Sequence, residues 1–217
     1  MRFRLAVLAT LILSVSIFAA ADNITESFGT PGPNPTPMLG ATYISFETLP
    51  NGTPTVSYSA LNSNDFLSLG VTINELGGNQ LIYTSGSGMS QPNYMSESNN
   101  SWAFNTQFVF TTPQAAVGLG VAEGGATFTI YSTTGSVLAI YNLVSNNTAL
   151  FGDNQYIMFN DQTGQNIGSV VATSNGGANA FGDLQFSATA TPEPSSIILL
   201  GTGLLGAAGA IRRKFAR

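Results

Sequence analysis

The chain has 217 residues with a formal net charge of −5, and it contains neither Cys nor His. Its six Lys and Arg residues lie only in the first four and last six positions, so every carboxylate, from Asp22 to Glu193, lies in a cation-free body. For that body, the composition excludes Ser-His-Asp and Cys-His catalysis, Schiff-base chemistry, ordinary zinc, copper, haem and iron–sulfur ligation, and cationic binding of phosphate or nucleic acid.

The N-terminal segment has the features of a secretory signal peptide. Arg2 and Arg4 precede an apolar run over residues 5–18, which is followed by a small-residue stretch that ends at Ala21. This order of basic, apolar and small residues is typical of a cleaved export signal. We expect cleavage after Ala21, so that residues 1–21 are removed. Cleavage one residue earlier and a retained membrane anchor are the alternatives.

Residues 22–39 predict an extended linker because they contain a Pro-rich stretch. Residues 40–190 predict one β domain, in which short β-branched and aromatic runs are separated by Gly, Asn, Ser and Pro. Side chains alternate with a period of two, as at Phe108 and Phe110. The candidate strands cover residues 42–47, 55–59, 71–74, 80–84, 101–104, 107–112, 115–122, 127–131, 137–141, 155–159, 167–173 and 184–188.

This pattern predicts an all-β fold, a two-sheet antiparallel β-sandwich of jelly-roll type. Helical periodicity is absent between the two ends of the chain, and no strict repeat supports a β-helix. Gly124-Gly125 and Thr134-Gly135 occur where tight hairpin turns are expected. Without Cys, side-chain packing and hydrogen bonds must hold the exported domain together.

The C-terminal segment resembles a short membrane helix. Residues 197–211 are apolar or small, and a helix of that length is about 22 Å long, shorter than the ~30 Å hydrocarbon core. Arg212, Arg213 and Lys214 follow directly and predict a cytoplasmic tail, with the body on the outer side of the membrane. A buried core helix is the alternative, but the terminal basic cluster argues against it.

Pro192, Glu193 and Pro194 precede this apolar segment, which the cluster Arg212, Arg213 and Lys214 then ends. This order resembles the PEP-CTERM sorting signal, over residues 191–217. The resemblance implies an exported protein of a Gram-negative bacterium that makes exopolysaccharide. It also implies a precursor anchored in the inner membrane by the 197–211 helix, and processing near Pro-Glu-Pro by an exosortase-type membrane transpeptidase. The cell surface or extracellular matrix is then the destination.

The body shows a looser resemblance to those of other PEP-CTERM proteins. Phe46-Glu47 on an early strand is similar to their Phe-acid pair, and Glu123-Gly124-Gly125 to their mid-chain Gly-rich hairpin. Gly182-Asp183-Leu184-Gln185-Phe186 is similar to their late Gly-Asp-Leu/Ile-x-Phe strand. The resemblance implies the same jelly-roll sandwich.

Two kinds of binding residue remain in the body. Glu47, near the first strand, and Asp183, near the last, are the best candidates for a Ca²⁺ site, because oxygen ligands suit this ion and the chain ends of a jelly roll often meet. The alternative is that each of these two carboxylates is simply a solvated residue at a strand end or a turn cap. Trp102, the only Trp, and nearby Tyr94 are candidates for stacking on a sugar, with a place in the core as the alternative.

We therefore predict a non-enzymatic surface protein, without nucleic-acid partners, whose body binds or spaces extracellular polysaccharide in the cell-surface or biofilm matrix. No cofactor is expected apart from the Ca²⁺ left open above. An adhesin-like module that contacts other proteins is a variant of this reading. The alternative from another class is a glycosidase or lyase that acts on matrix polysaccharide through a carboxylate pair. The segment from Asp161 to Asn166 has a single acid and predicts a turn instead of a Ca²⁺ loop.

Overall fold

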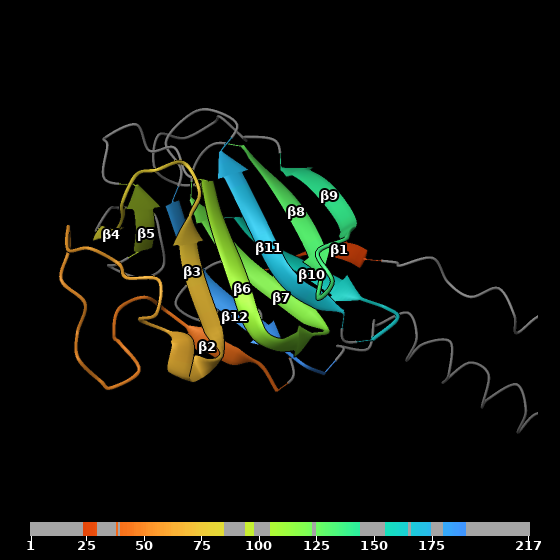
Figure 1. Ribbon diagram of the computed structural model, residues 1–217, viewed down its shortest axis with the longest axis horizontal. Coiled ribbons are helices and arrows are strands. Elements are labelled where there is room, and N and C mark those ends of the chain that lie inside the picture. Colours follow the sequence, from red (N-terminus) through yellow and green to blue (C-terminus); the bar gives the residue numbers. More distant parts are fainter. Residues whose placement is uncertain are drawn as a thin grey trace, which may run out of the picture.

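The structure is a computed structural model that describes residues 24–29, 38, 40–84, 94–97, 105–122, 125–143, 155–164, 166–174 and 180–189. These residues form two antiparallel sheets that face each other, and a single 3₁₀ turn, η2 (Leu67–Leu69) (Figure 1). The seven-stranded sheet has the order β1-β10-β7-β12-β5-β4, with β2 also paired to β12, and consists of β1 (Ile24–Gly29), β2 (Thr42–Ile44), β4 (Leu81–Thr84), β5 (Tyr94–Glu97), β7 (Ala116–Ala122), β10 (Gln155–Asp161) and β12 (Ala180–Ser187). The five-stranded sheet has the order β3-β6-β11-β8-β9 and consists of β3 (Val71–Glu75), β6 (Asn105–Gln114), β8 (Ala126–Ser132), β9 (Val137–Leu143) and β11 (Ile167–Ser174).

The pairing of the last eight strands has the nested order of a jelly roll. β5 pairs with β12 and β7 with β10 in one sheet, whereas β6 pairs with β11 and β8 with β9 in the other. In this series of eight strands the first pairs with the last, the second with the seventh, the third with the sixth and the fourth with the fifth. The same pairing arises when one long hairpin folds over on itself. The prediction of an antiparallel jelly-roll sandwich is confirmed.

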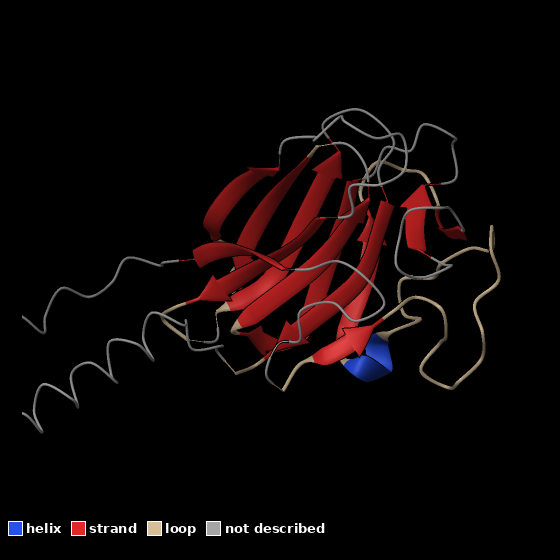
Figure 2. Cartoon of the chain, turned by 180° about the vertical axis from the view of Figure 1, so that it is seen from behind, coloured by secondary structure: helices blue, strands red, loops and turns tan. Residues whose placement is uncertain are grey.

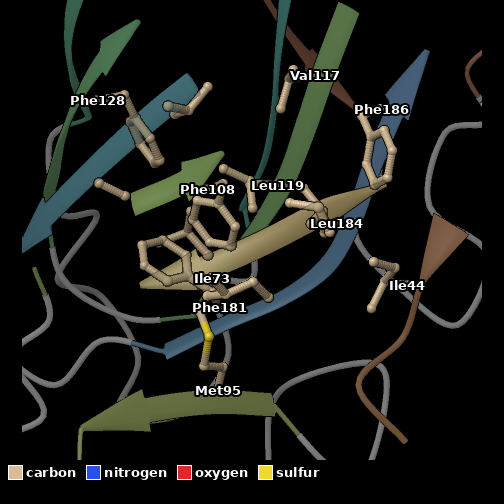
Figure 3. Packing of buried hydrophobic residues seen from close by; sticks show 14 of the residues in the cluster. Ile44, Ile73, Met95, Phe108, Val117, Leu119, Phe128, Phe181, Leu184 and Phe186 are labelled. Carbon is tan, nitrogen blue, oxygen red and sulfur yellow. The ribbon is translucent and has the colours of Figure 1, made fainter. Parts of the chain in front are cut away.

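The core lies between the two sheets and is formed by the inward-facing residues of strands from both sheets (Figure 3). Phe108 of β6 meets Phe181 of β12 edge to face, with ring centroids 5.8 Å apart. Phe128 of β8 packs on Phe159 of β10 at 5.3 Å. Each buried Phe contributes about 1.5–3 kcal/mol relative to leaving it exposed, so these aromatic pairs across the layers hold the two sheets together.

The side chain of Tyr141 connects the two sheets where their edge strands β1 and β9 lie at the same side of the sandwich. Tyr141 of β9 stacks on Phe159 with ring centroids 5.3 Å apart, and its hydroxyl donates a hydrogen bond to the backbone carbonyl of Ile24 in β1. Burial first, and the negative charge of Glu26 second, raise the pKa of Tyr141. The first strand is therefore joined to both sheets.

β1 begins the sheet within the stretch that the sequence assigned to the 22–39 linker. Ile24 is buried and β1 pairs with β10 along its whole length. β5 was also missed, because it is four residues long and has no β-branched side chain. Both strands owe their conformation to long-range pairing partners, which local composition does not reveal.

Two sequence expectations about the connections are wrong. Residues 55–59 are not a strand, since Tyr58 has a φ of 64° and lies in a turn. The segment contacts β4 through separate backbone hydrogen bonds, such as that from the Tyr58 N–H to the Tyr83 carbonyl, and is followed by an isolated bridge at Ala60. Gly125 does not belong to a hairpin either, because β7 and β8 lie in different sheets. By contrast, Gly135 has a φ of 82° in the β8–β9 hairpin, as expected for that turn.

The signal peptide, the strand expected at residues 101–104, the basic tail and the apolar helix at 197–211 lie outside the described residues. Within the described ranges, no helix has the length and hydropathy needed to cross a membrane. The boundaries of the four segments, 1–21, 22–39, 40–190 and 191–217, stay predictions.

Candidate functional site

The outer face of the five-stranded sheet is a regular and largely exposed surface, and we call it the open face (Figure 1). Its residues alternate with the buried core residues and lie opposite one another in the strand register, as at Gln107, Val171 and Thr129. The open face consists of Thr72, Asn74, Asn105, Gln107, Val109, Thr111, Thr127, Thr129, Tyr131, Val137, Ile140, Asn142, Ser169, Val171 and Thr173.

The open face carries hydroxyl, amide and short apolar groups, and none of its residues is charged. Hydrogen bonds between neighbouring strands order some of them: Thr173 Oγ1 donates to Asn105 Oδ1 at 3.3 Å, and Thr127 Oγ1 donates to Asn142 Oδ1 at 2.8 Å. Nearly all of the face is partly or fully exposed. Such a surface can donate and accept hydrogen bonds without attracting or repelling ions.

A shallow pocket of about 380 Å³ lies at one end of the open face. This volume falls in the range of about 300–1,000 Å³ that is usual for small-molecule sites. A Cβ atom on Gly168 of β11 would lie 2.7 Å from the Cα atom of Thr133, so only Gly allows the β8–β9 turn to approach this strand. The pocket is lined by Gln107, Val109, Phe110, Thr111, Thr112, Pro113, Ser132, Thr133, Gly135, Gly168 and Ser169.

The outer face of the seven-stranded sheet differs at its centre, where β10, β7 and β12 meet, and we call this region the closed face. Its outward β7 residues Ala116, Gly118 and Gly120 are small and buried. A Cβ atom on Gly118 would come within 2.4 Å of the Tyr156 hydroxyl oxygen, and one on Gly120 would come within 2.9 Å of the Gly182 carbonyl oxygen. Gly118 therefore provides the space that Tyr156 fills, and Gly120 allows the close approach of the β12 backbone.

Polar contacts tie the closed face to the N-terminal part of the chain. The Tyr43 hydroxyl of β2 donates to Asp183 Oδ1 at 2.5 Å, and the Met38 backbone N–H donates to Gln185 Oε1 at 3.0 Å. Asp183, Gln185 and Met38 are buried. The contacts fix β2 and residue 38 against β12, which indicates a structural role for this polar cluster.

Tyr156 is fully buried in the closed face, and its hydroxyl has no hydrogen-bond partner among the described residues. Burial first, and the negative charge of Asp183 second, raise the pKa of Tyr156 well above its ordinary value. The nearby Gln185 amide opposes this rise without reaching hydrogen-bond geometry. The phenol is thus held in its neutral form.

The two residues predicted to bind Ca²⁺ lie on neighbouring segments of the seven-stranded sheet. β2 pairs with β12, so the early and late strands do meet, with Ile44 opposite Leu184. Asp183 has a φ of 52° at a bulge in β12 and is engaged by Tyr43, while Glu47 is partly exposed beyond the end of β2. The described residues contain no group of three or more acidic side chains that suits a metal ion. A Ca²⁺ site shared by Glu47 and Asp183 stays a prediction.

The aromatic candidates from the sequence are not brought together by what the structure describes. Trp102 lies outside the described residues, and for Tyr94 only the backbone is described, in β5. Tyr131 lies on the open face, where sequence reasoning did not single it out. Tyr58 is 71% exposed in the loop before β4. Only the strand register, which the sequence does not give, could have assigned Tyr131 to a shared face.

The described carboxylates are dispersed among separate local structures. Asp161 accepts hydrogen bonds from the Thr163 and Asn166 backbone N–H groups, which confirms the turn expected there. A second pocket of about 370 Å³, beside β3, contains Glu75 as its one carboxylate, and the pocket on the open face contains none. Neither of these two pockets therefore offers the carboxylate pair that a glycosidase requires.

Several solved structures show a loose overall likeness to the chain. A variant of a family 29 carbohydrate-binding module, in complex with cellulohexaose, has 11% identity and a TM-score of 0.33, with 70% of this chain and 94% of that chain covered. Another family 29 module has 11% identity, a TM-score of 0.31, and coverage of 69% and 90%. The ligand-free module BiXyn10A CBM1 has 16% identity, a TM-score of 0.28, and coverage of 68% and 97%. These values are too low to transfer a ligand or a binding site.

Comparison with curated protein sequences gives no significant match. A family model does match the C-terminal segment, directly after the last described residue of the sandwich. The match covers residues 190–214 and so includes the Pro-Glu-Pro sequence, the apolar stretch and the first three residues of the basic cluster. The chain therefore carries a PEP-CTERM protein-sorting motif, as its sequence predicted.

Proposed function

We propose that this protein is a non-enzymatic component of the cell surface or matrix, and that its open face binds neutral extracellular polysaccharide. The observation that carries the proposal is the uncharged array of hydroxyl and amide groups across the five-stranded sheet. Sugar hydroxyls pair with Thr, Asn and Gln side chains as donors and as acceptors. Val109 and Val171 offer apolar contact to the carbon faces of the rings, and Tyr131 adds an aromatic surface.

Charge favours a neutral polysaccharide over an anionic one. The body between Leu5 and Ile211 contains eleven carboxylates and no Lys, Arg or His. Such a body repels polyanions at low ionic strength. A neutral polysaccharide avoids this repulsion. It also requires no charged side chain for binding, and the open face has no charged side chain.

The sorting motif supplies the location that this function requires. The PEP-CTERM motif implies export, passage through the inner membrane and processing by an exosortase-type transpeptidase. The precursor would be anchored by residues 197–211 until it is processed between this helix and the sandwich. The mature body would then face the polysaccharide that surrounds the cell, where it binds the chains or spaces them.

Binding can be measured with the full-length chain on an array of neutral and anionic polysaccharides, with and without Ca²⁺. We expect binding to neutral polysaccharides alone. Tyr131→Ala should lower the affinity about tenfold, which corresponds to about 1.4 kcal/mol. Tyr58→Ala is the matched control, since Tyr58 is a more exposed Tyr that lies outside the open face.

A second pair of variants tests the role of charge on the open face. Thr129→Arg places a large cation at the centre of the face and should abolish binding to neutral polysaccharide, whereas Val56→Arg adds the same charge in an exposed loop and should not. Equal binding by both variants would show that the open face is not the site. Binding by neither the original chain nor the variants to any glycan would refute the proposed function.

A further inference from the structure

The edge of the five-stranded sheet formed by β9 lacks two features that often protect edge strands, namely charged side chains and Pro, although a bulge interrupts its pairing with β8 between Val137 and Ala139. β9 is seven residues long, contains no charge and no Pro, and pairs only with β8 among the described residues. Figure 1 shows it as the outermost strand of its layer. Val137 and Ile140 are 53% and 58% exposed. A long, uncharged, apolar edge strand presents unpaired backbone groups and is a template for pairing with another strand.

The other described sheet edges differ from β9 in length, in charge or in cover. β3 carries Glu75, and its Ile73 N–H is bonded to the Ser63 carbonyl. β1 carries Glu26. β4 is covered by the segment before it, in which the Tyr58 N–H donates to the Tyr83 carbonyl at 2.5 Å. β2 also carries no charge and pairs only with β12 among the described strands, but it is three residues long. Within the described part of the chain, β9 is therefore the long edge strand that is both uncharged and uncovered.

The charge distribution identifies the partner that this edge suits. Because all the charged side chains of the body are carboxylates, two copies of the chain repel each other over most of their surfaces. The repulsion is smallest where two uncharged surfaces meet. An antiparallel pair of β9 strands brings together two such surfaces, and closed two-fold symmetry is the commonest arrangement of identical chains.

We propose that two copies of this protein associate through their β9 strands, antiparallel and centred on Ile140. Ile140 is the middle residue of β9, so a two-fold axis there places the two Ile140 side chains next to each other on the outer surface. The two five-stranded sheets then form one continuous layer, and their open faces lie on the same side. The association does not depend on polysaccharide binding, but it would give the protein two open faces in one surface.

One described carboxylate opposes the association. Glu26 lies in β1, the edge strand that the Tyr141 hydroxyl of β9 contacts at Ile24, so each copy of a pair would bring one negative charge near the shared edge. A single pair of strands is also a small interface, of the kind that gives weak complexes. We therefore expect association that depends on concentration and becomes tighter with salt.

Cross-linking tests the geometry, because the chain has no Cys of its own. Residues directly opposite each other in antiparallel strands have Cβ atoms about 4.5–5.5 Å apart, close to the disulfide range. The full chain with Ile140→Cys, exported by a Gram-negative host and mildly oxidised on intact cells, should form disulfide dimers at least ten times faster than the Val56→Cys chain. Val56 is the control because it is 67% exposed and lies in a loop away from β9.

Sedimentation of the full chain in detergent provides the second measurement. Ile140→Glu should weaken the dimer at least tenfold, Glu26→Gln should strengthen it severalfold, and Val56→Glu should leave it unchanged. Support requires both faster cross-linking at position 140 and selective weakening by Ile140→Glu. Equal cross-linking rates at positions 140 and 56, or equal effects of the two Glu variants, would overturn the proposal whether or not the protein binds glycans.

Discussion

The two sheets have the same antiparallel architecture but differ in what lies on their outer faces. On the five-stranded sheet the outward residues are mostly Thr, Asn, Gln and Val, and nearly all are at least partly exposed. At the centre of the seven-stranded sheet the outward β7 residues Ala116, Gly118 and Gly120 are small and buried, and Tyr156 lies against Gly118. Figure 2, which shows the molecule from behind, places the two layers against each other. One outer face thus serves the stability of the fold, and the other is left available for a ligand.

The largest expected effect is loss of stability in alkali, because it arises from buried phenols. Burial, then a hydrogen bond from the Tyr83 hydroxyl to Asp65 and the negative charge of Asp65, raise the pKa of Tyr83 above 10, and Tyr156 is raised chiefly by burial. The folded state therefore holds these protons more tightly than the unfolded chain does. The resulting stabilisation is complete below pH 10 and is lost as the pH rises toward the folded-state pKa.

Each of these two tyrosines should lower the free energy of unfolding by about 1.4 kcal/mol per pH unit above pH 10. Denaturant titrations of the chain between pH 9 and pH 12 measure this slope. Tyr156→Phe should remove the contribution of one of the two tyrosines to this slope. An unchanged slope would mean that Tyr156 is accessible to water in the folded protein.

Substitution of a closed-face glycine comes next in size. Gly118→Ala places a Cβ atom 2.4 Å from the Tyr156 hydroxyl oxygen, so the tyrosine ring or the strand must move. We expect a loss of about 1–3 kcal/mol in the free energy of unfolding. Thr129→Ala on the open face should change it by less than about 0.5 kcal/mol, as is usual for surface positions. Similar losses for both variants would remove the distinction between the two faces.

Tyr156→Phe should have a smaller effect of the opposite sign at neutral pH. The hydroxyl is buried without a hydrogen-bond partner among the described residues, and such groups cost about 1–3 kcal/mol. Its removal should therefore stabilise the protein by about 1 kcal/mol, or raise Tm by about 2–4 °C for a domain of this size. Thermal unfolding measures the change, and a lower Tm in this variant would reveal a partner for the hydroxyl.

The smallest expected effect concerns the carboxylates. Monovalent salt should screen the repulsion among them and raise the free energy of unfolding by about 0.5 kcal/mol. If Glu47 and Asp183 share a Ca²⁺ ion, millimolar Ca²⁺ should add a further increment at equal ionic strength, and Glu47→Gln should abolish it. Identical melting curves in Ca²⁺ and in EDTA would dismiss the metal site and leave the salt effect in place.

The inward side of the fold was predictable from the sequence. Alternating residues such as Phe128 and Ile130 mark the buried side of a strand, and these runs gave most of the long strands and the sandwich class. The prediction of a hairpin at Gly124-Gly125 was wrong because the periodicity of a strand does not reveal which sheet the next strand joins. For the same reason the open face was missed. Tyr131, Val171 and Gln107 are far apart in the sequence and become neighbours only through the β6-β11-β8 order.

Binding of polysaccharide by the open face is the central claim, and oxidative footprinting of the full chain with bound neutral polysaccharide tests it most directly. Tyr131 lies on the open face, and the more exposed Tyr58 lies outside it. We expect the polysaccharide to slow oxidation of Tyr131 several-fold while the rate at Tyr58 stays the same. Protection of Tyr58 with Tyr131 unchanged would place the binding surface elsewhere and contradict the assignment of the open face.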